Sequence, residues 1–155
     1  MERRTPPAWR GVTGFRDWGD PPVPSTDPRA CQVAWCAAAR AAGGQVEDFA
    51  KQEYPQNFHS ATISDRGGKH IALFHAHYPL VAFVGRRRYW YTDEFQEPPT
   101  WATVLSDVGF VVLSAARLLS PLEESDTSAL SAAERRQIKH WRPENLGAAL
   151  FNSWD

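Results

Sequence analysis

The chain has 155 residues, of which 43% are hydrophobic and 23% charged, and its 17 lysines and arginines nearly balance 18 aspartates and glutamates. This length and composition fit a single globular domain over residues 1–155, and they exclude a disordered chain, a collagen-like repeat and a disulfide scaffold. The formal net charge of -1 argues against a protein whose main role is to bind nucleic acid.

The two cysteines, Cys31 and Cys36, lie five residues apart in a segment that we expect to be helical. Five residues correspond to about 140° around a helix, so the thiols point to different sides and do not form a disulfide. No apolar core of a signal peptide is present near the first residue, and no apolar run approaches the ~20 residues that span a bilayer. We therefore expect a cytoplasmic protein with no membrane partner.

Residues 1–27 are rich in proline and glycine, yet they include Trp9, Phe15 and Trp18. A free tail rarely holds three large aromatic side chains, because each of them can bury a large apolar area. We predict an extended arm that packs on the domain.

A helix is predicted to follow this arm, with Asp27 as its N-cap, Pro28 at its first position and Gly43 at its C-terminal end. A short amphipathic segment over 46–53 comes next and stops before Pro55. The middle of the chain predicts an antiparallel meander, because runs of β-forming residues alternate with turns. Strands are expected over 58–64, 70–75, 80–84 and 88–92.

The last third of the chain predicts mainly helices. The first runs from Pro98 to Gly109, the second is a helical turn capped by Ser114, and the third begins with the capping box of Ser131 and Glu134. The final helix has Pro143 at its first position and Leu146, Leu150 and Trp154 along one side. A short strand over 110–113 lies between the first two. The fold class is therefore α+β, with a central antiparallel sheet of four or five strands (about residues 58–92 plus 110–113) flanked by N-terminal and C-terminal helices.

Histidines are the first candidates for a chemical role. On a strand, His75 and His77 lie on the same face and could present two nitrogens to a metal ion. His75 also shares that face with Ile71 and Leu73, which indicates that it points inward. A zinc site needs three or four ligands, and no further ligand pattern supplies them, so we expect no metal and no cofactor.

Cys31, His77 and Asp93 form the pattern that favours an enzyme. A cysteine in the first turn of a helix, with His and Asp on adjacent strands, resembles the arrangement in transglutaminase-like and papain-like cysteine enzymes. The run CQVAWCAAARAAG also resembles the nucleophile helix of the transglutaminase-like group. The resemblance implies Cys31 as nucleophile, His77 as base and Asp93 as the orienting carboxylate. The alternative, which we prefer, is a small apolar cysteine in a helix core.

The end of the chain carries the most distinctive pattern, W-x-P-x-x-x-G-x-x-x-F-N-x-W-D, over residues 141–155. It resembles a group of small, uncharacterised bacterial proteins that finish in the same way, and these are similar in size and make-up to immunity proteins that neutralise toxins of interbacterial competition. On chemical grounds we expect the tail to be a structural latch, that is, a segment that packs on the domain and stabilises it. In this segment Gly147 permits close packing, while Phe151 and Trp154 are buried. No base is paired with Asn152 or Asp155, which argues against a catalytic role for either of them.

The resemblance implies a non-catalytic binding protein whose partner is a cognate bacterial toxin. We place its contact surface at the predicted hairpin tip and the following loop, because exposed charges lie beside aromatic residues there. The residues are Arg86, Arg87, Trp90, Glu94 and Glu97. The same mixture of arginines and aromatics occurs on RNA-binding surfaces, but no wider basic groove accompanies it, so nucleic acid is not the expected partner.

Overall fold

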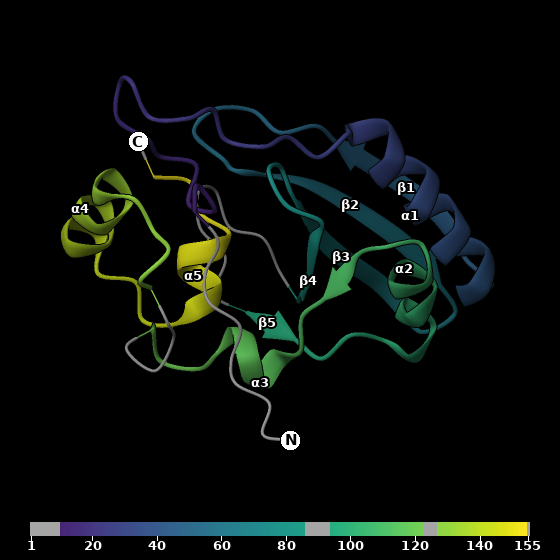
Figure 1. Cartoon of the computed structure of the whole chain (residues 1–155). Coiled ribbons are helices and arrows are strands. Elements are labelled where there is room, and N and C mark those ends of the chain that lie inside the picture. The colour runs from purple at the N-terminus through teal and green to yellow at the C-terminus, as the bar shows by residue number, and fades with distance from the viewer. Residues whose placement is uncertain (1–9, 86–93, 123–126, 155) are drawn as a thin grey trace, which may run out of the picture.

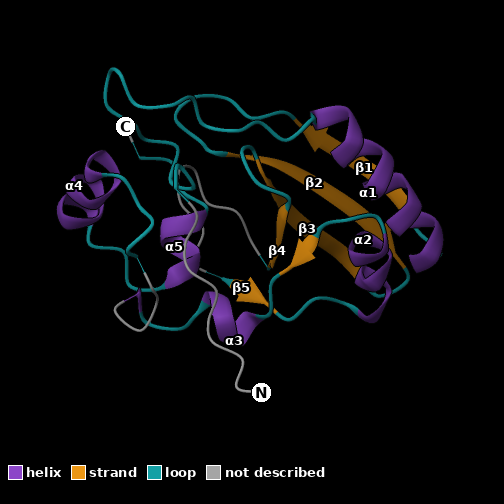
Figure 2. Cartoon of the chain, in the orientation of Figure 1, coloured by secondary structure: helices purple, strands orange, loops and turns teal. Residues whose placement is uncertain are grey.

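The computed structural model describes residues 10–85, 94–122 and 127–154 (Figures 1 and 2). These residues confirm the α+β class, with a mostly antiparallel sheet between an N-terminal helix and the C-terminal helices. The strands are β1 (Gln45–Ala50), β2 (Phe58–Asp65), β3 (Gly68–His75), β4 (Leu80–Val84), β5 (Phe95–Gln96) and β6 (Val111–Val112). The helices are α1 (Pro28–Ala42), the 3₁₀ helix η1 (Thr100–Ala102), α2 (Thr103–Asp107), α3 (Ala115–Leu118), α4 (Ala132–Trp141) and α5 (Leu146–Leu150).

The sheet has the order β1-β2-β3-β4-β5, with neighbouring strands antiparallel, and β6 adds a parallel pair with β4. β5 and β6 share the edge of β4 that faces away from β3. The described sheet thus has six strands instead of the expected four or five. The strand predicted over 88–92 lies outside the described residues.

Two described strands, β1 and β5, were not predicted, and β1 comes from the amphipathic segment predicted over 46–53. β1 pairs with β2 and forms one edge of the sheet, and its register shifts between Val46 and Asp48, which leaves Glu47 as an extra residue in a bulge. Five of its six residues are exposed, so its pairing depends on backbone hydrogen bonds more than on a buried face.

The sheet is covered on both faces, and alternation along the strands assigns residues to one face or the other. Leu73 belongs to the hydrophobic cluster that includes α3 and α5, whereas the next residue, Phe74, belongs to the cluster under α1 and α2. Figure 1 shows these two groups of helices at opposite sides of the sheet. All five residues of β4 are buried, as the apolar run Leu80–Val84 predicted.

Local sequence features confirm several helix ends. The Asp27 carboxylate accepts a hydrogen bond from the Arg29 backbone N–H at 3.0 Å, and Gly43 ends α1 in the left-handed conformation at φ 68°. Both halves of the capping box of Ser131 and Glu134 are present at the start of α4. In the described part of the chain, no helix is long and apolar enough to cross a membrane.

The final helix is shorter than predicted and begins later. Asn145, and not Pro143, determines its start, because the Asn145 side chain accepts a hydrogen bond from the Ala148 N–H at 2.8 Å. Since α5 ends at Leu150, Trp154 is not on the helix, and the predicted line of Leu146, Leu150 and Trp154 along one helical face is wrong.

Candidate functional site

Cys31 lies in the first turn of α1 as predicted, but its side chain is fully buried in the apolar cluster between α1 and the sheet. Burial, with a smaller contribution from the negative charge of Asp27, raises the pKa of its thiol to about 12. Such a thiol stays protonated at neutral pH, whereas a nucleophilic cysteine needs an accessible thiolate. The environment of Cys31 is that of a core residue.

His77 follows β3, and it contacts the backbone of Pro24 and the side chain of His75. Its Nδ1 lies 2.9 Å from the carbonyl oxygen of Pro24, and its own N–H donates to Nδ1 of His75 at 3.0 Å. No hydrogen bond joins Cys31 to His77, both of which the structure describes. Asp93, the third residue of the cysteine-enzyme hypothesis, lies outside the described residues.

The predicted partner surface is described only in part, because Arg86, Arg87 and Trp90 lie outside the described residues. Glu94 and Glu97 are exposed. The Glu94 carbonyl accepts a hydrogen bond from the Gly85 N–H at 2.8 Å. The Glu97 carboxylate accepts from the Ala115 N–H at 3.0 Å and so stabilises the start of α3.

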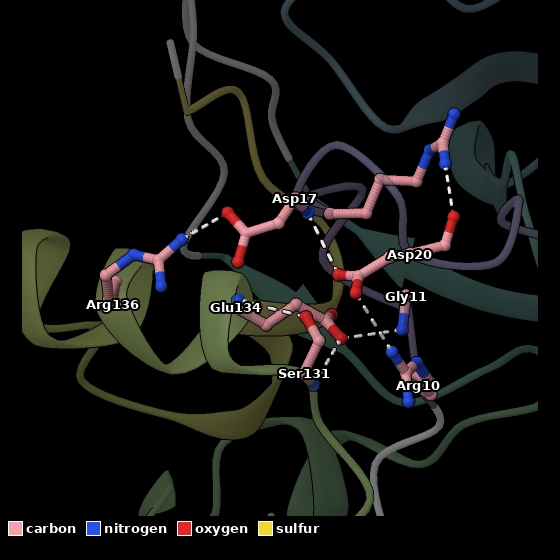
Figure 3. A network of polar contacts seen from close by, with 8 residues as sticks. Arg10, Gly11, Asp17, Asp20, Ser131, Glu134 and Arg136 are labelled. Atoms are coloured by element: carbon pink, nitrogen blue, oxygen red, sulfur yellow. Dashed lines mark hydrogen bonds and ion pairs between the residues drawn. The ribbon is translucent and has the colours of Figure 1, made fainter.

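The clearest polar arrangement in the described chain surrounds Glu134, which is fully buried (Figure 3). Its Oε1 accepts hydrogen bonds from the N–H groups of Gly11 at 2.6 Å and Ser131 at 3.1 Å. Its Oε2 accepts from the N–H and the hydroxyl of Thr13, at 2.9 and 2.6 Å. Because backbone amides can only donate, the side chain is held as a carboxylate whose oxygens are both occupied.

His75 binds Val12, which lies between Gly11 and Thr13 in the arm. Its Nδ1 accepts from the N–H groups of His77 and Tyr78 at 3.0 and 3.1 Å, so the ring proton is on Nε2, which donates to the Val12 carbonyl at 2.6 Å. Burial lowers the pKa of His75 to about 3. His75 is thus a neutral core histidine that points inward, as its strand position predicted, and both ring nitrogens are used.

Two buried asparagines complete this group. The Asn57 amide donates to the carbonyls of Val12 at 3.0 Å and Leu150 at 2.9 Å, and its oxygen accepts from the Asn152 N–H at 2.8 Å. The Asn152 amide donates to the Thr13 carbonyl at 3.1 Å. We call Asn57, His75, Glu134 and Asn152 the arm-binding cluster, because each of them contacts Gly11, Val12 or Thr13.

The arm-binding cluster holds the chain together and leaves no reactive group open to solvent, since all four of its side chains are buried. Its polar atoms satisfy buried backbone groups of the arm, as burial of polar groups requires. In residues 10–85, 94–122 and 127–154, no group of three or more histidine, cysteine and carboxylate side chains is placed to hold a metal ion.

The arm also presents an exposed aromatic side chain. Val12 and Thr13 are buried and Phe15 is half-buried, but the side chain of Trp18 is completely exposed. The prediction that the aromatic residues of the arm pack on the domain is therefore wrong for Trp18. Trp18 occupies a tight turn, in which the Asp20 N–H donates to the Asp17 carbonyl at 3.1 Å, and this turn projects it into solvent.

Beside this turn, the C-terminal segment forms an aromatic stack. Trp154 contacts Phe15 of the arm, and its ring is parallel to that of Trp141 on α4, with the centroids 6.2 Å apart in both pairs. Phe151 and Trp154 are buried, as the latch hypothesis predicted, whereas Trp141 is 42% exposed. The indole N–H of Trp141 donates to Gln137 at 3.0 Å, which fixes the orientation of the ring.

No sequence pattern indicated the roles of Asn57 and Val12, and Trp18 was expected to pack on the domain. The capping box identified Glu134 but not its bonds to Gly11 and Thr13, which connect residues 123 and 121 positions apart. Searches of protein-family models, curated proteins and solved structures found no match to this chain.

Proposed function

We propose that this protein is a non-catalytic bacterial binding protein, an immunity protein that neutralises a toxin by occluding its active site. The observation that supports the non-catalytic part is the burial of three side chains of chemically reactive type. Cys31, His75 and Glu134 are all fully buried, and the last two use their polar atoms to hold the arm. An enzyme needs such groups in an accessible cleft.

The choice of partner rests on the C-terminal pattern, which resembles small bacterial proteins of the immunity type. The contact surface that we propose comprises Arg86, Arg87 and Trp90, which the sequence predicts at a hairpin tip, together with the exposed Glu94 and Glu97. A stable complex of this kind buries about 1,200–2,000 Å² in total, usually around aromatic and arginine anchors.

Co-expression with a candidate toxin from a neighbouring gene tests this function. We expect restored growth of the toxin-producing cells and a complex that elutes as one species in size-exclusion chromatography. Arg87→Glu should weaken both effects, whereas Arg66→Glu, at the exposed turn between β2 and β3, serves as the matched charge reversal and should leave them unchanged. Absence of both complex and rescue would refute the proposal.

The same assay separates binding from the cysteine-enzyme hypothesis. A binding protein protects without a nucleophile, so Cys31→Ala should protect as well as the wild type once its folding has been verified by circular dichroism. Loss of protection by a folded Cys31→Ala protein would instead favour the enzyme.

A further inference from the structure

We propose that Trp18 and the C-terminal end of α4 form a second contact surface, which binds an acidic patch on the protein partner. This inference rests on the proposed function, since it assumes that the protein acts by binding another protein. We call this region the Trp18 surface, and its residues are Trp18, Lys139, His140, Trp141 and Arg142.

The first argument is that the turn that carries Trp18 is held firmly. The Asp17 N–H donates to the Asp20 carboxylate at 3.0 Å, and Arg16 donates to the Asp20 carbonyl at 2.7 Å. Gly19 has φ 95°, which position i+2 of a type II turn requires. The turn thus fixes the backbone from which the exposed Trp18 indole projects, so the turn itself loses little conformational entropy when a partner binds.

One ion pair joins the same turn to α4 and another joins it to the preceding part of the arm (Figure 3). Asp17 pairs with Arg136 on α4, and Asp20 lies 3.5 Å from the guanidinium of Arg10. The turn is therefore attached to α4, one helical turn before His140. Phe15 and Trp154 provide a second connection, because Trp154 stacks on Trp141.

The second argument is the charge of the Trp18 surface. Lys139, His140 and Arg142 are exposed, and none of the three is in an ion pair with a described residue. Of the nearby acids, Glu134 is buried and Asp17 and Asp20 bind arginines, while the exposed Glu144 lies two residues after Arg142. Lys139 and Arg142 outnumber this one carboxylate, and the excess of positive charge around two tryptophans is complementary to an acidic surface with an apolar pocket.

A protein fits this surface better than a nucleic acid does. A single-stranded nucleic acid needs a basic groove that follows its backbone, with aromatic rings on which successive bases stack. Here the cations cluster at one helix end, and the whole chain has a formal net charge of -1. One projecting indole with a cationic rim is typical of a protein-interface anchor.

The test measures the affinity of the purified full-length protein for the adjacent-gene toxin, together with its affinity for a poly-dT oligonucleotide. Trp18→Ala removes the anchor without exposing any core, and Trp18→Phe is the conservative control. Lys139→Glu reverses a charge of the surface, and Arg66→Glu is its matched control on the turn between β2 and β3.

We expect Trp18→Ala to weaken toxin binding by at least about tenfold, with Trp18→Phe intermediate. Lys139→Glu should slow association at low salt, and Arg66→Glu should leave the affinity within about twofold. If the toxin binds the wild type and Trp18→Ala equally well, this inference is refuted while the proposed function stands. If the wild type does not bind the toxin, both are refuted. Binding of poly-dT that is lost in Trp18→Ala would refute a protein as the occupant.

Discussion

Replacing Glu134 by glutamine measures how strongly the arm is held to the domain. The substitution keeps the size of the side chain but replaces one carboxylate oxygen by an NH₂ group. All four groups around the carboxylate act as donors in the structure, from Gly11, Ser131 and Thr13. Wherever the NH₂ group points, it meets two of these donors.

The better orientation places the NH₂ group beside Thr13, because its hydroxyl can rotate and accept while only its backbone N–H loses its partner. The opposite orientation leaves the N–H groups of both Gly11 and Ser131 unpaired. A buried, unpaired N–H costs about 1–3 kcal/mol, and the remaining hydrogen bonds lose their charge assistance. Removing a buried charge offsets part of this, so we expect a loss of about 2–4 kcal/mol in the free energy of unfolding.

Urea unfolding followed by tryptophan fluorescence gives this free energy, and Glu144→Gln provides a control at an exposed glutamate just after α4. Hydrogen exchange of the Gly11 and Thr13 amides should also accelerate in Glu134→Gln, because these amides lose their acceptor. A loss below about 1 kcal/mol with unchanged exchange at both amides would refute the account of Glu134 as the anchor of the arm.

Three further predictions concern the core. Burial lowers the pKa of His75 to about 3 from 6.5, so the unfolded state binds more protons between these two pH values. The free energy of unfolding, measured with urea at several pH values, should therefore fall as the pH is lowered from 6.5 towards 3. If this free energy changes with pH over about 4.5–6.5 in the same way in His75→Gln, the prediction is contradicted. Gly147→Ala should lower the free energy of unfolding by about 1–3 kcal/mol in thermal or urea unfolding, because its new Cβ would lie 2.5 Å from the Phe95 ring. A Gly147→Ala protein as stable as the wild type would contradict this. In a thiol assay of the native protein, the exposed Cys36 should react quickly and the buried Cys31 only after denaturant is added, whereas rapid labelling of native Cys36→Ser would show that Cys31 is accessible.

The elements that the sequence predicted well have local physical causes. Asp27 and Gly43 mark the ends of α1 through hydrogen bonds within a few residues, and Ser131 begins α4 in the same way. The buried run Leu80–Val84 identified β4 because a strand covered on both faces needs apolar side chains throughout.

The elements that were missed depend on contacts made across the fold. β1 has little apolar alternation, and it is a strand because β2 supplies hydrogen-bond partners along its length. Pro143 looked like a helix start, but the side chain of Asn145 caps the following turn. The arm-binding cluster connects segments up to 139 residues apart, for which one sequence has no local pattern.

The bonds between the arm and Glu134 have a consequence for biosynthesis. The N-terminal segment emerges from the ribosome well before the residue that accepts its amide protons has been translated, since Gly11 and Glu134 are 123 positions apart. Until α4 exists, water must solvate the amides of Gly11 and Thr13, although Asn57 and His75, which bind the Val12 carbonyl, are translated earlier. Complete attachment of the arm is thus a late event in the maturation of each newly made molecule.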